Sequence, residues 1–135
     1  MALIEWKPEF SLGMPEVDTE HRDLIDIINR LYEKIQSRQN PATIVDFLAE
    51  LRACATKHFV HEEQVMQRRG YSAYDEHRAD HARLLDELDT MMNDLQNEGL
   101  REDDTIADRL HDWFCNHFKT YDAPLHRLIS SYLLL

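Results

Sequence analysis

Several histidines and carboxylates interrupt apolar stretches of this chain, at spacings that could build a metal site. In two pairs the members are four residues apart, a spacing that places both side chains on one face of a helix. A buried imidazole or carboxylate is unfavourable unless it is paired, neutralised or bound to a metal. The candidate ligands are His21, His58, Glu62, His77, His81, His117 and Asp122.

These residue types limit the kind of metal centre without naming the metal. Seven protein ligands exceed what one tetrahedral zinc ion binds, whereas two metal ions bridged by the two carboxylates would use all of them. Imidazole-rich sites suit iron, zinc, copper or nickel. The chain has no Glu-x-x-His motif, which argues against ferritin-like oxidase or hydroxylase chemistry. The alternative without a metal is a set of core histidines that hydrogen-bond to their neighbours.

Apolar residues recur at three- and four-residue intervals along four stretches, as expected of amphipathic helices. With 3 Gly and 4 Pro among 135 residues, the composition favours long helices over many short strands. The expected helices run from Asp18 to about Ile35, from Pro41 to Gly70, from Ser72 to near Gly99, and from the Asp103–Asp104 pair to about Tyr121.

Helix starts are indicated by residues that satisfy unpaired backbone N–H groups. Asp18 is a suitable N-cap for the first helix, and Asn40 with Pro41 begins the second. Ser72 and Asp75 have the spacing of a capping box for the third. These signals divide the chain into four helices with short connections.

Short connections favour antiparallel neighbours, so the expected fold is an all-α, up-down-up-down four-helix bundle. The first dozen or so residues, which include Pro8 and Pro15, are expected to form an extended N-terminal arm. The length fits a single domain that spans residues 1–135. In such a bundle the starts of the first and third helices meet the ends of the second and fourth. The candidate ligands therefore converge at one end of the molecule.

His117 and Asp122 are five residues apart, which an ideal helix places about 140° apart around its axis. For both side chains to reach one site, the helix must widen locally or change its path at its end. Pro124 disfavours helical geometry at Ala123 and is one possible cause of such a change.

The chain carries a formal net charge of −11, from 26 acidic and 15 basic side chains. This charge argues against binding to nucleic acid and to an anionic membrane surface.

The N-terminus shows no basic leader with an apolar run, and the apolar C-terminal segment is too short to insert into a membrane. Cys54 and Cys115 form no CxxC motif, so we expect two buried thiols in a cytoplasmic protein.

Taken in order, the candidate ligands resemble those of the hemerythrin family, in particular single-domain bacterial hemerythrins. The resemblance lies in His58-Phe-Val-His-Glu62, His77-x-x-x-His81 and Trp113-Phe-Cys-Asn-His117-x-x-x-x-Asp122. The lead-in Gly13-Met-Pro-Glu-Val-Asp18-Thr-Glu-His21 is also similar. The match covers nearly the whole chain. Leu125 is a departure, because some relatives carry a tyrosine there.

The resemblance implies two non-haem iron ions (Fe²⁺/Fe³⁺) bridged by an oxo or hydroxo group and by Glu62 and Asp122. One iron ion would be bound by three histidines and the other by two, the second keeping an open position for oxygen. The implied ligands are His77, His81 and His117 on the first ion, and His21 and His58 on the second. Apolar side chains at Trp113, Phe114 and Phe118 would shield this site from water.

The implied function is reversible binding of molecular oxygen by an oxygen carrier, store or supplier, and not an enzyme. Its partners would be oxygen and an oxygen-consuming enzyme that receives it, and the chain would act as a monomer. The alternatives are a di-iron peroxidase or nitric oxide reductase, and an oxygen or redox sensor. His61, His111 and His126 are expected to be surface or interhelical histidines outside the site, and Glu63 is expected to be solvated.

Overall fold

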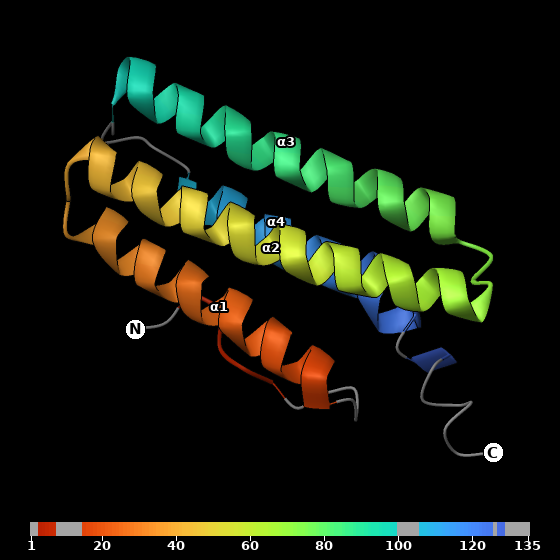
Figure 1. Ribbon diagram of the computed structural model, residues 1–135. Helices are drawn as coiled ribbons and strands as arrows, with labels where there is room; N and C mark the ends of the chain where they lie inside the picture. Colours follow the sequence, from red (N-terminus) through yellow and green to blue (C-terminus); the bar gives the residue numbers. More distant parts are fainter. Residues whose placement is uncertain (1–2, 8–14, 100–105, 126, 129–135) are drawn as a thin grey trace.

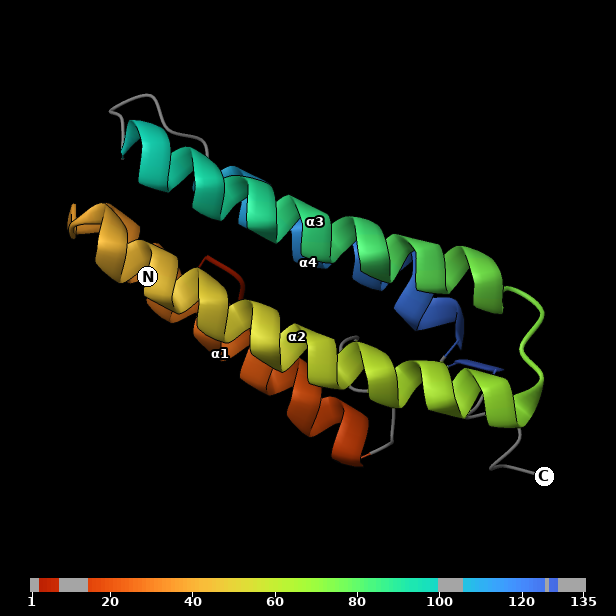
Figure 2. The same cartoon turned by 45° about the horizontal axis from the view of Figure 1, so that its top comes forward.

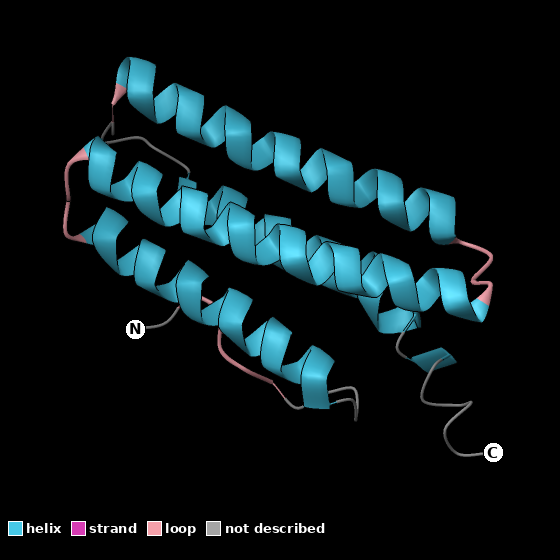
Figure 3. Ribbon diagram, viewed as in Figure 1, coloured by secondary structure: helices cyan, strands magenta, loops and turns pink. Residues whose placement is uncertain are grey.

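The computed structural model describes residues 3–7, 15–99, 106–125 and 127–128, and within these ranges all regular structure is helical (Figures 1 and 3). The elements are α1 (Pro15–Gln36), α2 (Pro41–Arg69), α3 (Tyr74–Glu98), α4 (Ile106–His117) and a π-helix, η2 (Phe118–Asp122), that continues α4. The expected all-α four-helix fold is confirmed.

The helices pack as a four-membered ring. Helix α1 contacts α2, α2 contacts α3, and α4 contacts both α1 and α3. Figure 2 shows α1 beside α2, and α3 beside α4. Because neighbours run antiparallel, the starts of α1 and α3 and the ends of α2 and α4 lie at one end of the bundle (Figure 1).

Three of the expected helix boundaries are confirmed in detail. The Asn40 side chain accepts a hydrogen bond of 2.9 Å from the backbone N–H of Thr43, and Pro41 begins α2. Gly70 follows α2 with a φ of 60°, and Gly99 follows α3 with a φ of 73°. Such positive φ angles favour glycine because it has no Cβ.

Other boundary predictions are wrong. Helix α1 begins at Pro15, so Asp18 lies in its first turn and is not its N-cap. Helix α3 begins at Tyr74 after Ala73, which makes no side-chain capping bond, so Ser72 and Asp75 do not form the expected capping box. The Asp103–Asp104 pair lies outside the described residues.

The main apolar core extends along the bundle from the end opposite the site as far as the converging ends, where it includes Phe59, Phe114 and Phe118. Its fully buried residues include Ile28, Leu48, Leu51 and Leu88. A smaller apolar cluster of Met66 and Leu125, with Val65, Tyr71 and Tyr74 packed against it, lies near the converging ends. The candidate ligands lie on helical segments between these two clusters.

Residues 3–7 are not helical and lie against α1. The backbone N–H of Ile4 donates to Asn29 Oδ1 at 2.9 Å, and Asn29 Nδ2 donates to the Ile4 carbonyl at 2.8 Å. The Arg22 guanidinium lies 4.1 Å from the Trp6 ring centroid. These contacts hold this part of the arm beside the bundle.

Among the helices that the structure describes, none has the length and apolar character needed to span a bilayer.

Candidate metal centre

All seven candidate ligands are buried, with at most 4% of their surface exposed. They come from every helix of the bundle. Helix α1 supplies His21, α2 supplies His58 and Glu62, α3 supplies His77 and His81, and the last helix with its π-helical extension supplies His117 and Asp122. The structure therefore brings together all seven residues singled out in the sequence.

Their ligand atoms form two overlapping groups, each with all members within 4.8 Å of one another. The first group contains three histidines and the second contains two. Glu62 and Asp122 belong to both groups. The first is Glu62, His77, His81, His117 and Asp122, and the second is His21, His58, Glu62 and Asp122.

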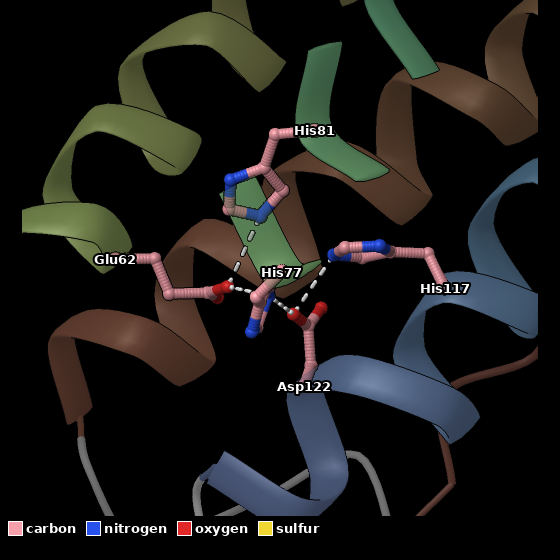
Figure 4. A group of neighbouring side chains, drawn as sticks. All are labelled: Glu62, His77, His81, His117 and Asp122. Carbon is pink, nitrogen blue, oxygen red and sulfur yellow. Dashed lines mark hydrogen bonds and ion pairs between the residues drawn. The ribbon is translucent and has the colours of Figure 1, made fainter. Parts of the chain in front are cut away.

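In the three-histidine group, one oxygen of each carboxylate faces the imidazole nitrogens (Figure 4). Glu62 Oε1 lies 2.7 Å from Nε2 of His77 and 3.3 Å from Nε2 of His81. Asp122 Oδ1 lies 3.0 Å from Nε2 of His77 and 2.9 Å from Nε2 of His117. Three nitrogens and two oxygens thus face a common point.

In the two-histidine group, the other oxygen of each carboxylate is nearest. Glu62 Oε2 lies 2.9 Å from Nε2 of His58, and Asp122 Oδ2 lies 3.7 Å from Nε2 of His21. Each carboxylate therefore offers one oxygen to each group, as a ligand that bridges two metal ions would do.

The π-helix η2 brings His117 and Asp122 together. Its wider turn is marked by the backbone N–H of Ala123, which donates to the carbonyl of Phe118 five residues earlier. Local widening, one of the two possibilities for this segment, is confirmed. Pro124 does not end the helix, because Ala123 keeps helical angles of φ −61° and ψ −44°.

Three acidic residues that were not assigned to the site from the sequence lie near Nδ1 of its histidines, on the opposite side of each ring from Nε2. Nδ1 of His117 lies 2.5 Å from Asp80 Oδ2, and Nδ1 of His81 lies 3.0 Å from Glu63 Oε2. Nδ1 of His58 lies 3.5 Å from Glu20 Oε2. The expectation that Glu63 is solvated is wrong. Such a carboxylate fixes the ring and its tautomer, leaving Nε2 to bind a metal.

Charge interactions determine the protonation of the metal-free site. Burial disfavours the charged form of His117, but the nearby carboxylates of Asp122 and Asp80 outweigh burial and raise its pKa to about 10. Burial and Glu62 act to raise the pKa of Asp122, but His117 and His77 lower it to about 2. Metal binding at these nitrogens would release protons.

The donor atoms fit a bound metal. Nε2 of His81 and Nε2 of His117 are buried without a hydrogen bond of acceptable geometry, although carboxylate oxygens lie near both. Buried polar atoms in this condition are rare in native structures and call for an explanation such as a bound ion. Two cations would satisfy these nitrogens and neutralise the two carboxylates.

A small cavity of about 10 Å³ borders the site. This is near the smallest space that admits one water molecule. Apart from candidate ligands, its lining is hydrophobic or aromatic: Leu24, Phe59, Leu84, Trp113 and Phe114. The Phe114 ring lies 6.3 Å from the His21 ring and stacks on Phe118 at 6.0 Å. Trp113 is fixed by a hydrogen bond of 2.9 Å from Nε1 to the Leu84 carbonyl.

The other histidines are outside both groups, as expected, where the structure describes them. His61 is partly exposed and contacts Glu20 at 2.7 Å, and His111 is exposed. The side chain of His126 lies outside the described residues. Cys54 and Cys115 are free thiols of intermediate burial.

Comparison with known proteins connects this site to one family. Residues 12–129 match the model of the hemerythrin HHE cation binding domain. The chain is 34% identical to a hemerythrin of Themiste dyscrita over 117 residues, which cover 87% of this chain and 86% of the relative. It is 32% identical to a bacteriohemerythrin of Clostridium acetobutylicum over 88 residues, 63% of this chain and 68% of the relative.

A solved structure of wild-type hemerythrin has the same fold. It superposes with a TM-score of 0.81 at 24% sequence identity, covering 93% of this chain and 97% of the other. At this sequence identity the superposition shows only that the two proteins share the same arrangement of helices. The family match and the sequence identities are the evidence that links the buried cluster to a cation-binding domain.

Proposed function

The chain belongs to the hemerythrin family, and from that premise we propose that it binds molecular oxygen reversibly at two iron ions held by its buried cluster. The observation that carries the proposal is the sharing of Glu62 and Asp122 between a three-histidine and a two-histidine group. One four-coordinate metal ion would leave three of the seven ligands unused. Two ions bridged by the carboxylates use all seven.

We assign His77, His81 and His117 to one ion and His21 and His58 to the other. The ion with two histidines has fewer protein ligands, and therefore an open coordination position. When bound, a pair of ferrous ions supplies the two electrons that reversible oxygen binding takes up. Imidazole ligands suit iron, and the family match supports a cation site.

Aromatic residues of the protein enclose the proposed oxygen-binding side of the metal centre. Phe114 and Phe118 lie edge-on to His21 at centroid distances of 6.3 and 5.3 Å, so they cover the two-histidine side of the cluster. Their apolar rings exclude water and supply no proton to a bound ligand. Low proton access favours release of oxygen over its loss as peroxide.

Stopped-flow mixing of the reduced, iron-loaded protein with oxygen tests this proposal. A carrier forms a long-lived coloured adduct that disappears under vacuum and returns on re-exposure. Rapid decay to the oxidised form with turnover of peroxide would instead indicate a di-iron peroxidase. Turnover of nitric oxide by the reduced protein would indicate a reductase. Either outcome would contradict the carrier function.

A further inference from the structure

We propose that Asp80 is a positioning residue of the metal centre, acting through His117. The inference rests on the proposed function, since it assumes that Nε2 of His117 binds a metal. Asp80 comes from α3, and its Oδ2 lies 2.5 Å from Nδ1 of His117 on the last helix. It belongs to neither group of candidate ligands.

The two nitrogens of His117 face different partners. Nδ1 faces Asp80, whereas Nε2 faces Asp122 Oδ1 at 2.9 Å. An ionised carboxylate accepts hydrogen bonds but cannot donate one. The hydrogen bond between Asp80 and His117 therefore requires the proton to be on Nδ1. The lone pair of a neutral ring then lies on Nε2, on the side of the candidate ligands. Asp80 thereby selects the tautomer that can bind a metal.

A second interaction fixes Asp80 itself. Its other oxygen, Oδ1, accepts a hydrogen bond of 2.8 Å from Nε of Arg83, one turn later on the same helix. Arg83 also donates from Nη1 to Glu87. With one oxygen held by Arg83, the carboxylate has little freedom to rotate away from His117.

Asp80 differs from the two other acids behind histidines. Its side chain is 7% exposed, against 22% for Glu63 and 19% for Glu20. Asp80 also lies nearest to its histidine, with 2.5 Å between its oxygen and Nδ1, against 3.0 Å for Glu63 and 3.5 Å for Glu20. Charge interactions weaken with solvent exposure. Asp80 should therefore have the largest electronic effect on its metal ion.

A carboxylate that accepts the Nδ1 proton makes Nε2 a stronger donor. Stronger donation stabilises the oxidised metal ion over the reduced one. We therefore expect Asp80 to strengthen iron binding and to lower the reduction potential of the centre. A residue that only packed the helices together would affect the melting temperature and leave the potential unchanged.

The test compares Asp80→Asn and Asp80→Ala with Asp89→Asn and Asp89→Ala. Asp89 is a matched control, because it lies on the same helix and pairs with an arginine, Arg52, at 2.8 Å. The structure gives it no contact with a candidate ligand. The measurements are ferrous ion affinity in an anaerobic titration, the reduction potential, and the melting temperature of the metal-free protein.

Asp80→Ala should weaken iron binding roughly 10–100-fold, the usual effect of removing such a partner, and should raise the potential. Asp80→Asn has nearly the same shape and keeps an acceptor oxygen. Its iron affinity should therefore lie between those of Asp80→Ala and the wild type, while its reduction potential stays above that of the wild type. Both Asp89 variants should match the wild type.

Equal affinities and potentials in the Asp80 and Asp89 variants, with the wild type carrying two iron ions, would overturn this inference and leave the proposed function intact. A wild type that binds no iron would refute the proposed function and the inference with it. Because Asp80→Asn is nearly isosteric, a melting temperature near wild type would establish that its shifted potential is not a folding defect.

Discussion

Nε2 of His117 lies 2.9 Å from Oδ1 of Asp122, although the two residues are five positions apart along one continuous helical segment. An ideal α-helix would place them about 140° apart. The π-helix Phe118–Asp122 removes this difference by widening one turn. Such single π turns occur frequently at functional sites.

Deleting Thr120, an exposed residue of this turn, should therefore preserve the site. His117 and Asp122 would become four apart, and an ordinary α-helix places such residues about 40° apart. We expect the deletion variant to retain two iron ions per chain by elemental analysis. Iron loss equal to that of Asp122→Ala would mean that the π-helix has a role beyond spacing.

This segment illustrates how far the sequence could predict the site. Spacing alone revealed the problem at His117 and Asp122 and offered two solutions, because i,i+5 is incompatible with one face of an α-helix. Choosing between them required the backbone. Pro124 indicated a change of path, yet Ala123 remained helical, since the residue before a proline is biased away from helix but not excluded from it.

The acids behind the histidines could not be found in the same way. Asp80 and His117 are 37 residues apart and lie on different helices, so they come into contact only when α3 and α4 pack together. Nothing in the spacing of Asp80 distinguishes it from the other acids of this acidic chain. Six of the candidate ligands were predictable because each interrupts an apolar stripe, and Asp122 was predicted from its place near His117 and from the family resemblance.

His81→Ala should lose iron while His111→Ala keeps it. His81 is 2% exposed and its Nε2 faces Glu62, whereas His111 is exposed and belongs to neither group. The measurement is iron per chain after identical loading. Equal loss in the two variants would mean that the wrong histidines were assigned to the site.

Glu62→Gln should impair both metal positions, because Glu62 offers an oxygen to each group. We expect affinity to fall by more than the roughly 10–100-fold that is typical of residues behind a ligand. Glu50→Gln is the control, since Glu50 is an exposed acid of the same helix. Retention of both iron ions in Glu62→Gln would show that this carboxylate does not bridge them.

Phe114→Ala should keep near-normal iron content but shorten the lifetime of the oxygenated form. The ring lines the small cavity and lies edge-on to His21, so its removal should admit water and protons. Phe114→Leu, which keeps a large apolar side chain, should resemble the wild type. Decay of the oxygenated absorption band in air measures the effect. An unchanged decay rate in Phe114→Ala would assign water exclusion to other residues.

If the proposed function is correct, one chain binds one oxygen molecule at two iron ions and releases it again. The most direct measurement is an oxygen titration of the reduced protein, with iron determined on the same sample. We predict two iron ions per chain, one oxygen molecule taken up per iron pair, and full recovery of the reduced spectrum when oxygen is removed. A single metal ion per chain, zinc at full occupancy after iron-replete expression, or irreversible consumption of oxygen would contradict it.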